Sequence, residues 1–314
     1  MLSRFKLMNP YFSVIISVYN KENHISQTLS SVINQTFKDF EIIIVNDGST
    51  DQSLYITKQF EDSRITIIDQ ENRGVSHARN QGLEIAKGKY IALLDGDDLW
   101  DTLFLETIRN TISIYPNEYI FTTAIAHKYD NQIVPVSYSY DLNKSILVLN
   151  YFEASQDHSI LTGSSAVFEK EILSNTGNFN ESLKSGEDTD FWIRCGIHYP
   201  VVFVNKIMVH YVYSSTSLSN TSFNLNDKPN YNDYDEAEKN NVHLKKFLDR
   251  NRFSLAILSK LNDDKTSFAF YKKSLNINNL SFKRRFLLDS PKWLVNILLK
   301  MKALGGRKTY YQSL

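Results

Sequence analysis

The chain has 314 residues, enough for one large domain or for a main domain with an appendage. Hydrophobic residues make up 42% and charged residues 22%, which excludes a largely disordered chain. The net charge is +0, so we expect no nucleic-acid partner. The single cysteine, Cys195, excludes a disulfide framework and a cysteine-based zinc site, and we therefore expect a reducing, cytoplasmic setting.

Apolar, β-rich runs alternate with helical patterns over the first hundred residues. The predicted strands are 12–19, 40–46, 64–70 and 90–94, and helical periodicity occupies 24–35, 51–62 and 75–86. Nearly continuous apolar strands separated by helices predict a parallel sheet covered by helices on both faces, an α/β fold.

The pattern becomes mixed from residue 101 onward. It predicts helices near 103–114 and 189–199, and strands near 119–127, 164–168 and 201–204. Residues 219–241 are polar and carry turn formers, so we expect a linker or exposed loop there, followed by a helical C-terminal extension. No signal peptide is visible, and no run approaches the roughly 20 apolar residues that span a bilayer.

Polar or aromatic residues follow four predicted strands. In open parallel sheets, ligands bind beyond the carboxyl ends of the strands, so these residues outline one cleft. The groups in question are Tyr19 and Glu22, then Asp47, then Asn72, Arg73 and Gly74, and finally Asp95, Asp97 and Asp98.

Three carboxylates in "LLDGDD" suit a divalent cation. The chain has no G-x-x-x-x-G-K-[ST] loop and no G-x-G-x-x-G turn after the first strand, so a bound phosphate needs a metal or basic side chains. Asp95, Asp97 and Asp98 offer the hard oxygen ligands that Mg²⁺ or Mn²⁺ prefers beside substrate phosphates. The alternative is that Asp97 and Asp98 merely open the following helix, favoured by its dipole.

These residues resemble a known family. "VIISVYNKENHISQTLSSVINQTFKDFEIIIVNDGSTDQS" and "NRGVSHARNQGLEIAKGKYIALLDGDD" are similar to the N-terminal half of family 2 glycosyltransferases, and the resemblance runs from about Phe12 to about Ser219. It implies a GT-A fold (Rossmann-like, mainly parallel) over 1–219, with a nucleotide-binding half at about 12–100 and an acceptor and catalytic half at about 101–219. Residues 220–314 would then be a linker and a helical C-terminal region.

The resemblance also implies an activity: inverting transfer of a single sugar from a nucleotide-diphosphate sugar, most simply a UDP-sugar, to an acceptor hydroxyl. The acceptor would belong to a surface polysaccharide or a lipid-linked glycan. Mn²⁺ or Mg²⁺ would be the cofactor.

Site residues carry over by position. Tyr19 matches the aromatic that stacks on the base, with Glu22 in the same loop, and Asp47 matches the carboxylate that accepts a hydrogen bond from the base. Arg79 matches the basic residue near the diphosphate. Asp95 matches the first acid of the family's D-x-D motif, near ribose and metal, and Asp97 matches the metal-ligating second acid. The alternatives are a core aromatic for Tyr19, a turn and helix cap for Asp47, and a surface salt bridge for Arg79.

A second acidic cluster lies in "SGEDTDFWIRC". Glu187, Asp188 and Asp190 stand where a helix is predicted to begin, and Ser185 with Asp188 also fits a capping box. In the family, the matching acid pair holds the general base, which aligns with Asp188 and would take the acceptor hydroxyl's proton. Upstream, Gly163 and Ser164 either line the acceptor pocket or belong to the core.

The chain departs from the family at one segment. Where a Tyr-Arg-x-His pattern is common, Val212 and Ser214 replace the Arg and His, and whether the adjacent His210 takes over is open. The Q-x-x-R-W signature is absent, which disfavours a polymerising synthase. The rivals are a non-catalytic nucleotide-sugar or glycan-binding module and a metal-dependent phosphohydrolase. The latter places Gly-Thr after its second Asp, whereas Asp98-Leu99 follows Asp97 here.

The C-terminal tail is basic. Residues 280–314 carry eight Lys or Arg and one acid, so the tail is +7 and the remainder −7. The apolar face of 291–304 predicts either a helix in the headgroup region of an anionic membrane or one docked on the body or at a dimer interface. We therefore expect a cytoplasmic protein, peripheral on the inner face of the cell membrane in the first case and a homo-oligomer in the last.

Overall fold

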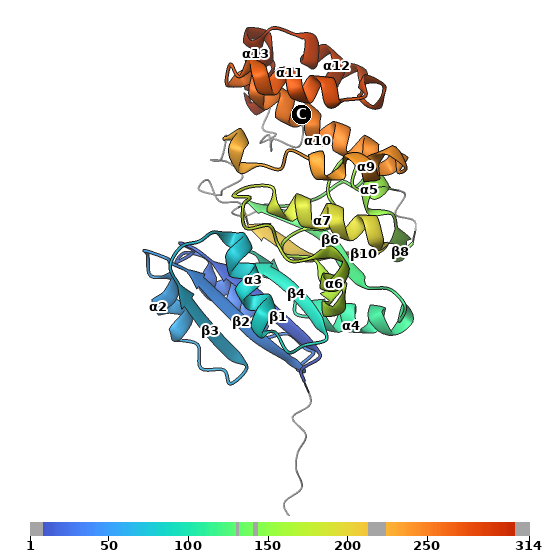
Figure 1. Cartoon of the computed structure of the whole chain (residues 1–314). Helices are drawn as coiled ribbons and strands as arrows, with labels where there is room; N and C mark the ends of the chain where they lie inside the picture. Colours follow the sequence, from blue (N-terminus) through green and yellow to red (C-terminus); the bar gives the residue numbers. More distant parts are fainter. Residues whose placement is uncertain (1–8, 130–131, 141–143, 213–223, 305–314) are drawn as a thin grey trace, which may run out of the picture.

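One ten-stranded sheet forms the centre of the computed structural model, which describes residues 9–129, 132–140, 144–212 and 224–304 (Figure 1). The strand order is β3-β2-β1-β4-β9-β6-β10-β5, with β7 paired to β6 and β8 to β10. The strands are β1 (Phe12–Val18), β2 (Phe40–Asp47), β3 (Ile65–Gln70), β4 (Tyr90–Asp95), β5 (Leu99–Trp100), β6 (Ile120–Tyr129), β7 (Gln132–Pro135), β8 (Ile146–Leu149), β9 (Val167–Glu169) and β10 (Val201–Val212).

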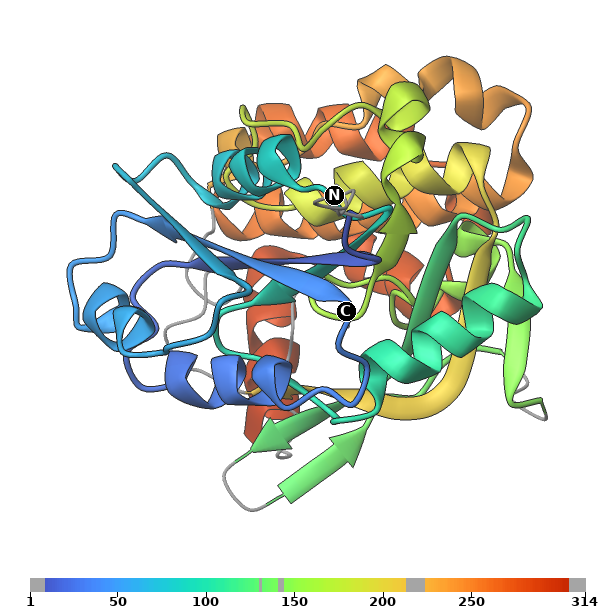
Figure 2. The same ribbon diagram turned by 90° about the horizontal axis from the view of Figure 1, so that it is seen from below.

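The first half is a parallel sheet between two layers of helices, as the alternating pattern predicts. β1 pairs in parallel with β2 and β4, and β2 with β3. Because side chains alternate along a strand, Ile15 packs toward α3 (Val75–Ile85), whereas Val14 and Ile16 pack toward α1 (Ile25–Ile33) and α4 (Phe104–Ile114). α2 (Ser53–Lys58) lies beside α1, and Figure 2 shows the sheet between the two layers.

The second half of the sheet is mixed. β9 runs antiparallel between β4 and β6, and β6 and β10 form a long parallel pair. The expected strand at 164–168 begins only at Val167, because Ser164 and Ser165 lie in a turn in which the Ser165 hydroxyl bonds to Thr122 and Thr162. α5 (Tyr151–Ala154), α6 (Leu173–Thr176) and α7 (Glu187–His198) complete this half, with a 3₁₀ turn at Lys170–Ile172.

The described part of the expected linker, 224–241, is not an exposed loop. It contains 3₁₀ turns at Leu225–Asp227 and Asn232–Tyr234 and helix α9 (Asp235–Lys239). Tyr231 and Tyr234 are buried, and the Tyr234 hydroxyl donates to Asp190 Oδ1 at 2.6 Å. The prediction was wrong here because two aromatic rings in a polar stretch provide enough apolar surface to dock it. Residues 219–223, with the predicted boundary between 219 and 220, lie outside the described residues.

The C-terminal extension is helical, as predicted. It comprises α10 (Val242–Leu261), α11 (Lys265–Ser274), a 3₁₀ turn at Ile277–Asn279, α12 (Phe282–Asp289) and α13 (Lys292–Leu304). α10 packs on α5, and its buried Leu244, Phe247 and Leu248 continue the core that lies beneath α7. Within the described ranges, no helix is long and apolar enough to cross a membrane.

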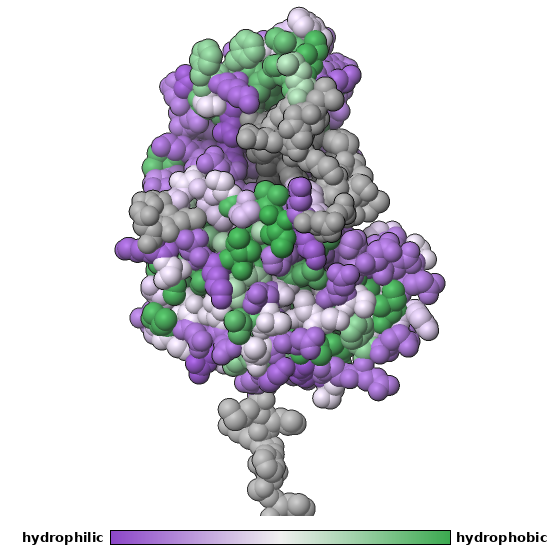
Figure 3. All heavy atoms as spheres, turned by 180° about the vertical axis from the view of Figure 1, so that it is seen from behind, coloured by the Kyte–Doolittle hydropathy of each residue, from purple (hydrophilic) through white to green (hydrophobic). Residues whose placement is uncertain are grey.

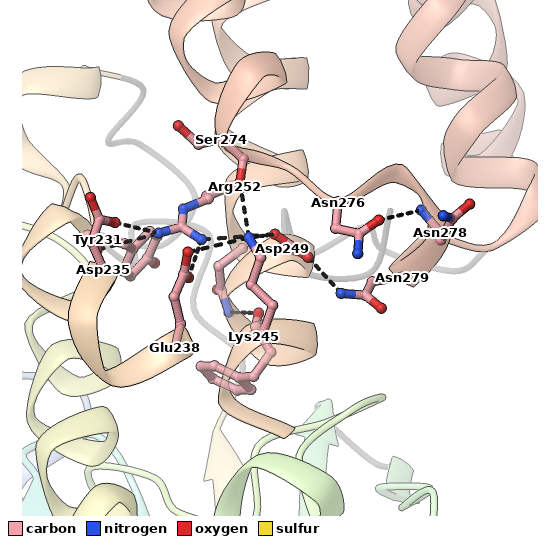
Figure 4. A network of polar contacts seen from close by, with 12 residues as sticks. Tyr231, Asp235, Glu238, Lys245, Asp249, Arg252, Ser274, Asn276, Asn278 and Asn279 are labelled. Carbon is pink, nitrogen blue, oxygen red and sulfur yellow. Dashed lines mark hydrogen bonds and ion pairs between the residues drawn. The ribbon is translucent and has the colours of Figure 1, made fainter. Parts of the chain in front are cut away.

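A buried ionic network fastens α10 to α9 and to the turn after α11 (Figure 4). The guanidinium of Arg252 lies against Glu238, Asp235 and Asp249, while Lys245 Nζ reaches Asp249 Oδ1 at 2.6 Å. Because such charges are costly to bury unpaired, the network makes these helices one unit.

Candidate active site

The loop after β1 is held in place by the loop after β2. Thr50 N donates to Asn20 Oδ1 at 2.8 Å, and Gln52 N donates to Glu22 Oε2 at 3.0 Å. Asn20 adopts a left-handed φ of 51°, which turns the chain sharply beyond β1. Tyr19 is 43% exposed at this rim, so the core-aromatic alternative was wrong.

Asp47 is buried at the end of β2. Its Oδ1 accepts from Gln70 Nε2 at 2.7 Å and Arg73 N at 2.9 Å, and its Oδ2 accepts from Gly74 N at 2.8 Å. These partners come from β3 and the loop after it, not from the start of α2, so Asp47 is not a helix cap. A carboxylate has about four acceptor positions, which leaves one for a ligand.

The three acids after β4 point in different directions. Asp95 and Asp97 line the rim: Asp97 forms an ion pair with Lys21, and Asp95 reaches Arg79. Asp98 is turned inward, where its Oδ2 accepts from Ser164 Oγ at 2.6 Å and its Oδ1 from Val212 N at 3.0 Å. Asp98 therefore does not share the rim with Asp95 and Asp97, and the helix-opening alternative was wrong because β5 follows these acids.

Asp98 is an interior acid that ties two chain segments together. Burial raises its pKa well above the usual range, and the neighbouring Asp97 and Asp95 raise it further. Its two bonds link Ser164, in the turn before β9, to the last residue of β10. This acid therefore shapes the floor of the cleft from inside.

Arg79 joins the two acidic clusters that the sequence separates by about a hundred positions. It lies on α3 with only 3% of its surface exposed, and its guanidinium contacts Asp95 Oδ1 at 2.8 Å, Glu187 Oε1 at 3.2 Å and Asp188. Burial alone would lower the pKa of Arg79, but Asp188, Asp95 and Glu187 hold it above its ordinary value. The surface salt-bridge alternative was therefore wrong.

Glu187 and Asp188 occupy the first turn of α7. The preceding Gly186 has a left-handed φ of 81° and no side chain caps the helix, so the capping box was wrong. Burial and the adjacent Asp188 raise the pKa of Glu187 to about 7, and burial likewise raises the pKa of Asp188 although Arg79 opposes this. Two carboxyl groups thus compete for one arginine.

Asp190, in the same turn, has a structural position. It pairs with Arg194 at 2.7 Å and accepts the Tyr234 hydroxyl, and it does not contact Arg79. Of the three acids at this helix start, only Glu187 and Asp188 reach the cleft.

Gly163 forms the floor between the clusters. A Cβ on this residue would lie 3.0 Å from Asp95 Oδ2, 3.0 Å from Asp188 Oδ2 and 2.7 Å from an Arg79 nitrogen. Oδ1 of each acid is bound to Arg79, and the Oδ2 atoms of both acids converge on Gly163 beside an Arg79 nitrogen. Gly163 therefore belongs to the cleft, whereas Ser164 beside it is wholly buried and braces Asp98.

The described end of β10 carries His210 and Tyr211, next to the position of the family's Arg. Tyr211 is partly buried against the core, where it lies beside Asp98 and Asp95 and bonds to Thr162. His210 points to the opposite face of the strand, toward Lys128 and Asp101, and does not replace the missing histidine. Position 214 lies outside the described residues.

The exposed Tyr19 and the buried Asp47 lie at the sheet edge where a nucleotide would bind, and Arg79 joins two acidic clusters beside them. This is the layout of a glycosyl-transfer enzyme. Residues 13–177, more than half of the chain, match the family model described as glycosyl transferase family 2. The chain belongs to this family, and the resemblance noted in the sequence is confirmed.

Three proteins of similar sequence are compared with the chain by identity and coverage. The chain is 45% identical over 35% of its length to glycosyltransferase GlyA of Streptococcus pneumoniae, of which it covers 16%. It is 29% identical over 69% of its length to an uncharacterized glycosyltransferase of Rickettsia prowazekii, and it covers 69% of that protein. It is 32% identical over 58% of its length to the minor teichoic acid biosynthesis protein GgaB of Bacillus subtilis, and it covers 21% of that protein.

Among solved structures, S. aureus TarS residues 1–349 in complex with UDP-GlcNAc matches with a TM-score of 0.69 at 19% identity, over 94% of this chain and 92% of that chain. The fold prediction, a GT-A α/β domain with a helical C-terminal extension, is confirmed.

Proposed function

We propose that this protein transfers a single sugar from a nucleotide-diphosphate sugar to an acceptor hydroxyl with inversion at the anomeric carbon. The observation that carries the proposal is the geometry around Arg79, which brings the rim acid Asp95 and the helix acid Asp188 together over Gly163. The proposed donor-side acid and the proposed base thus lie close together, joined by Arg79.

Asp188 is the general base of the proposed reaction. With Oδ1 held by Arg79, its Oδ2 is free to accept the acceptor hydroxyl's proton as that oxygen forms a bond to the anomeric carbon. The bond from the anomeric carbon to the diphosphate breaks at the same time, and its electron pair leaves with the diphosphate. Attack from the face opposite the leaving group inverts the configuration.

The residues at the rim fit a divalent cation that arrives with its substrate. In the described part of the chain, no three His, Cys, Asp or Glu side chains gather into a ready-made metal cage. Asp97, with Asp95 beside it, supplies the one or two carboxylates that Mg²⁺ or Mn²⁺ takes together with phosphate oxygens and water. Bound there, the ion would neutralise charge on the departing diphosphate.

The donor and acceptor classes follow from chemistry and from similar proteins. Tyr19 offers a stacking face, Asp47 one acceptor position for a base N–H, and Glu22 braces their loop. Because TarS was solved with UDP-GlcNAc and GgaB is named for teichoic acid biosynthesis, we propose a UDP-sugar donor and an acceptor in surface polysaccharide or lipid-linked glycan synthesis.

Asp188→Asn tests the base assignment. We expect sugar transfer to fall by about 10²–10⁴-fold, because proton removal is lost while the shape is kept. Calorimetric UDP affinity should not weaken, since the change frees Arg79 from one acid. Asp62→Asn, which alters a carboxylate paired with Arg64 outside this site, is the control. Wild-type turnover in Asp188→Asn would refute the assignment.

The donor and the metal are tested together. A thermal-shift screen of nucleotide sugars with and without Mn²⁺ should single out UDP-sugars and show that Mn²⁺ strengthens the shift. Asp97→Ala should weaken UDP binding only when Mn²⁺ is present. Equal affinity in the two proteins with Mn²⁺ contradicts the metal role, and UDP binding without transfer or donor hydrolysis favours a binding module instead.

A further inference from the structure

Helices α12 and α13 leave large apolar side chains in solvent. Phe282 is 86% exposed, Trp293 63% and Met301 62%. Phe286, Ile297 and Leu298 are exposed on the same two helices. Figure 3 shows apolar residues at the surface of this end of the molecule. Exposed apolar residues gathered in this way mark a binding surface more often than chance scatter.

The body of the protein does not account for this face of α13. The helix is already docked: Val295 is 1% exposed, and the partly buried Leu299 packs on the core shared with α10. Trp293, Ile297 and Met301 are spaced four residues apart and so form a separate stripe that points outward. The alternative of simple docking on the body explains one face and leaves the larger apolar one uncovered.

Basic side chains flank the apolar ones. Residues 282–301 contain five Lys or Arg and a single acid, Asp289, which pairs with Lys272 at 2.8 Å. Lys283 and Lys300 are exposed, and neither has an ion-pair partner in the described ranges. The surface therefore offers apolar anchors together with unneutralised positive charge.

We propose that α12 and α13 dock this protein on an anionic lipid bilayer, lying in the headgroup region with Phe282, Trp293 and Met301 inserted. A lipid surface meets both halves of the pattern, since acyl chains cover the apolar anchors and anionic headgroups pair with Lys283 and Lys300. A second copy fits less well, because a symmetric contact would place the same basic residues against each other. This proposal does not depend on the sugar-transfer reaction.

Trp293 is a built-in probe for the test. The other two tryptophans, Trp100 and Trp192, are 4% and 1% exposed, so only Trp293 can report a change at the surface. On mixing the full-length protein with phosphatidylcholine–phosphatidylglycerol vesicles, we expect a blue shift of tryptophan emission and quenching by brominated acyl chains. Both signals should be absent in Trp293→Phe and with pure phosphatidylcholine.

Two variant sets separate the anchors from the charges. Lys283→Glu/Lys300→Glu should weaken vesicle partitioning by roughly 30-fold or more, at about 1 kcal/mol for each basic residue near the surface, and salt should weaken wild-type binding likewise. Phe282→Ser/Ile297→Ser should also lose binding. Ile114→Ser, which removes a 62% exposed apolar residue on α4, should bind as the wild type does.

Three results would overturn the proposal. The first is unchanged Trp293 emission in anionic vesicles, and the second is equal partitioning of the wild type and Lys283→Glu/Lys300→Glu. The third is a dimer in light scattering that Phe282→Ser/Ile297→Ser dissolves without any vesicle binding, which would assign the surface to a second copy. Thermal unfolding midpoints equal to that of the wild type show that each variant is folded.

Discussion

Two buried arginines, each facing three acids, can be compared within this one chain. Arg79 on α3 is 3% exposed and contacts Asp95, Glu187 and Asp188. Arg252 on α10 is 1% exposed and contacts Asp235, Glu238 and Asp249. Arginine and carboxylate counts are the same, so the count alone does not separate a site from a structural clamp.

The difference lies in what the remaining carboxylate oxygens do. Around Arg252, Asp249 also accepts from Lys245 Nζ at 2.6 Å and Asn279 Nδ2 at 2.7 Å, and Glu238 also pairs with Lys245 at 3.3 Å (Figure 4). Around Arg79, by contrast, Asp95 and Asp188 each direct a second oxygen at the space above Gly163. Filled acceptor positions indicate a clamp, whereas acceptor positions left open toward a cleft indicate a binding or catalytic role.

Arg252→Met should produce the largest effect, a loss of about 3–5 kcal/mol in the free energy of unfolding measured with urea. Removing the arginine leaves Glu238 and the fully buried Asp249 undercompensated. Lys246→Met, an exposed change on the same helix, should stay within about 0.5 kcal/mol. UDP affinity of folded Arg252→Met should equal that of the wild type, and a stability loss under about 1 kcal/mol would mean that the network is no clamp.

Arg79→Met should have the opposite effect to Arg252→Met, with a large loss of sugar transfer and a small loss of stability. On the proposed mechanism, we expect the barrier to sugar transfer to rise by about 3–4 kcal/mol, because the substitution removes a cation close to the proposed leaving group and raises the pKa of Asp188, the proposed base. The unfolding free energy should fall by less than about 2 kcal/mol, since Asp95 and Asp188 lie partly in water and can be hydrated or protonated. Arg109→Met, which changes an exposed residue on α4, is the control. A stability loss equal to that of Arg252→Met would erase the contrast between the two arginines.

How far the sequence alone could reach is visible at particular residues. Periodicity predicts β1–β4 and the helices between them because those patterns are local. Family resemblance selects Arg79 and Asp188, and the structure places them in contact. The pairing of Lys21 with Asp97, the inward turn of Asp98 and the docking of Tyr234 on Asp190 depend on long-range packing and carry no local signal. Asp97 and Asp98 are adjacent and have the same side chain. The backbone turn that directs Asp98 inward therefore cannot be predicted from the residue types.

Glu187→Gln sharpens the comparison through pH. The pKa of Glu187 is raised from its ordinary value near 4.5 to about 7, so the folded protein holds the proton more tightly than the unfolded chain. Stability therefore falls as pH rises from about 4.5 to 7 and stays lower above that range. Glu187→Gln should flatten this slope and stabilise the protein by about 3 kcal/mol at pH 8. A slope equal to that of the wild type, in unfolding midpoints taken across this range, would contradict the shift.

Tyr234→Phe carries the smallest expected effect and separates two acids that look alike in the sequence. Asp188 and Asp190 stand two residues apart in the first turn of α7. Only Asp190 has its oxygens bound by the Arg194 guanidinium and the Tyr234 hydroxyl. Deleting that hydroxyl should lower the unfolding free energy by about 1.5–3 kcal/mol, the value of a hydrogen bond to a charged acceptor, and leave sugar transfer unchanged. Tyr55→Phe, on the exposed surface of α2, should change neither. A fall in transfer without a fall in stability would mean that Asp190 also serves the reaction, and the rule that filled acceptors mark a clamp would fail at this helix.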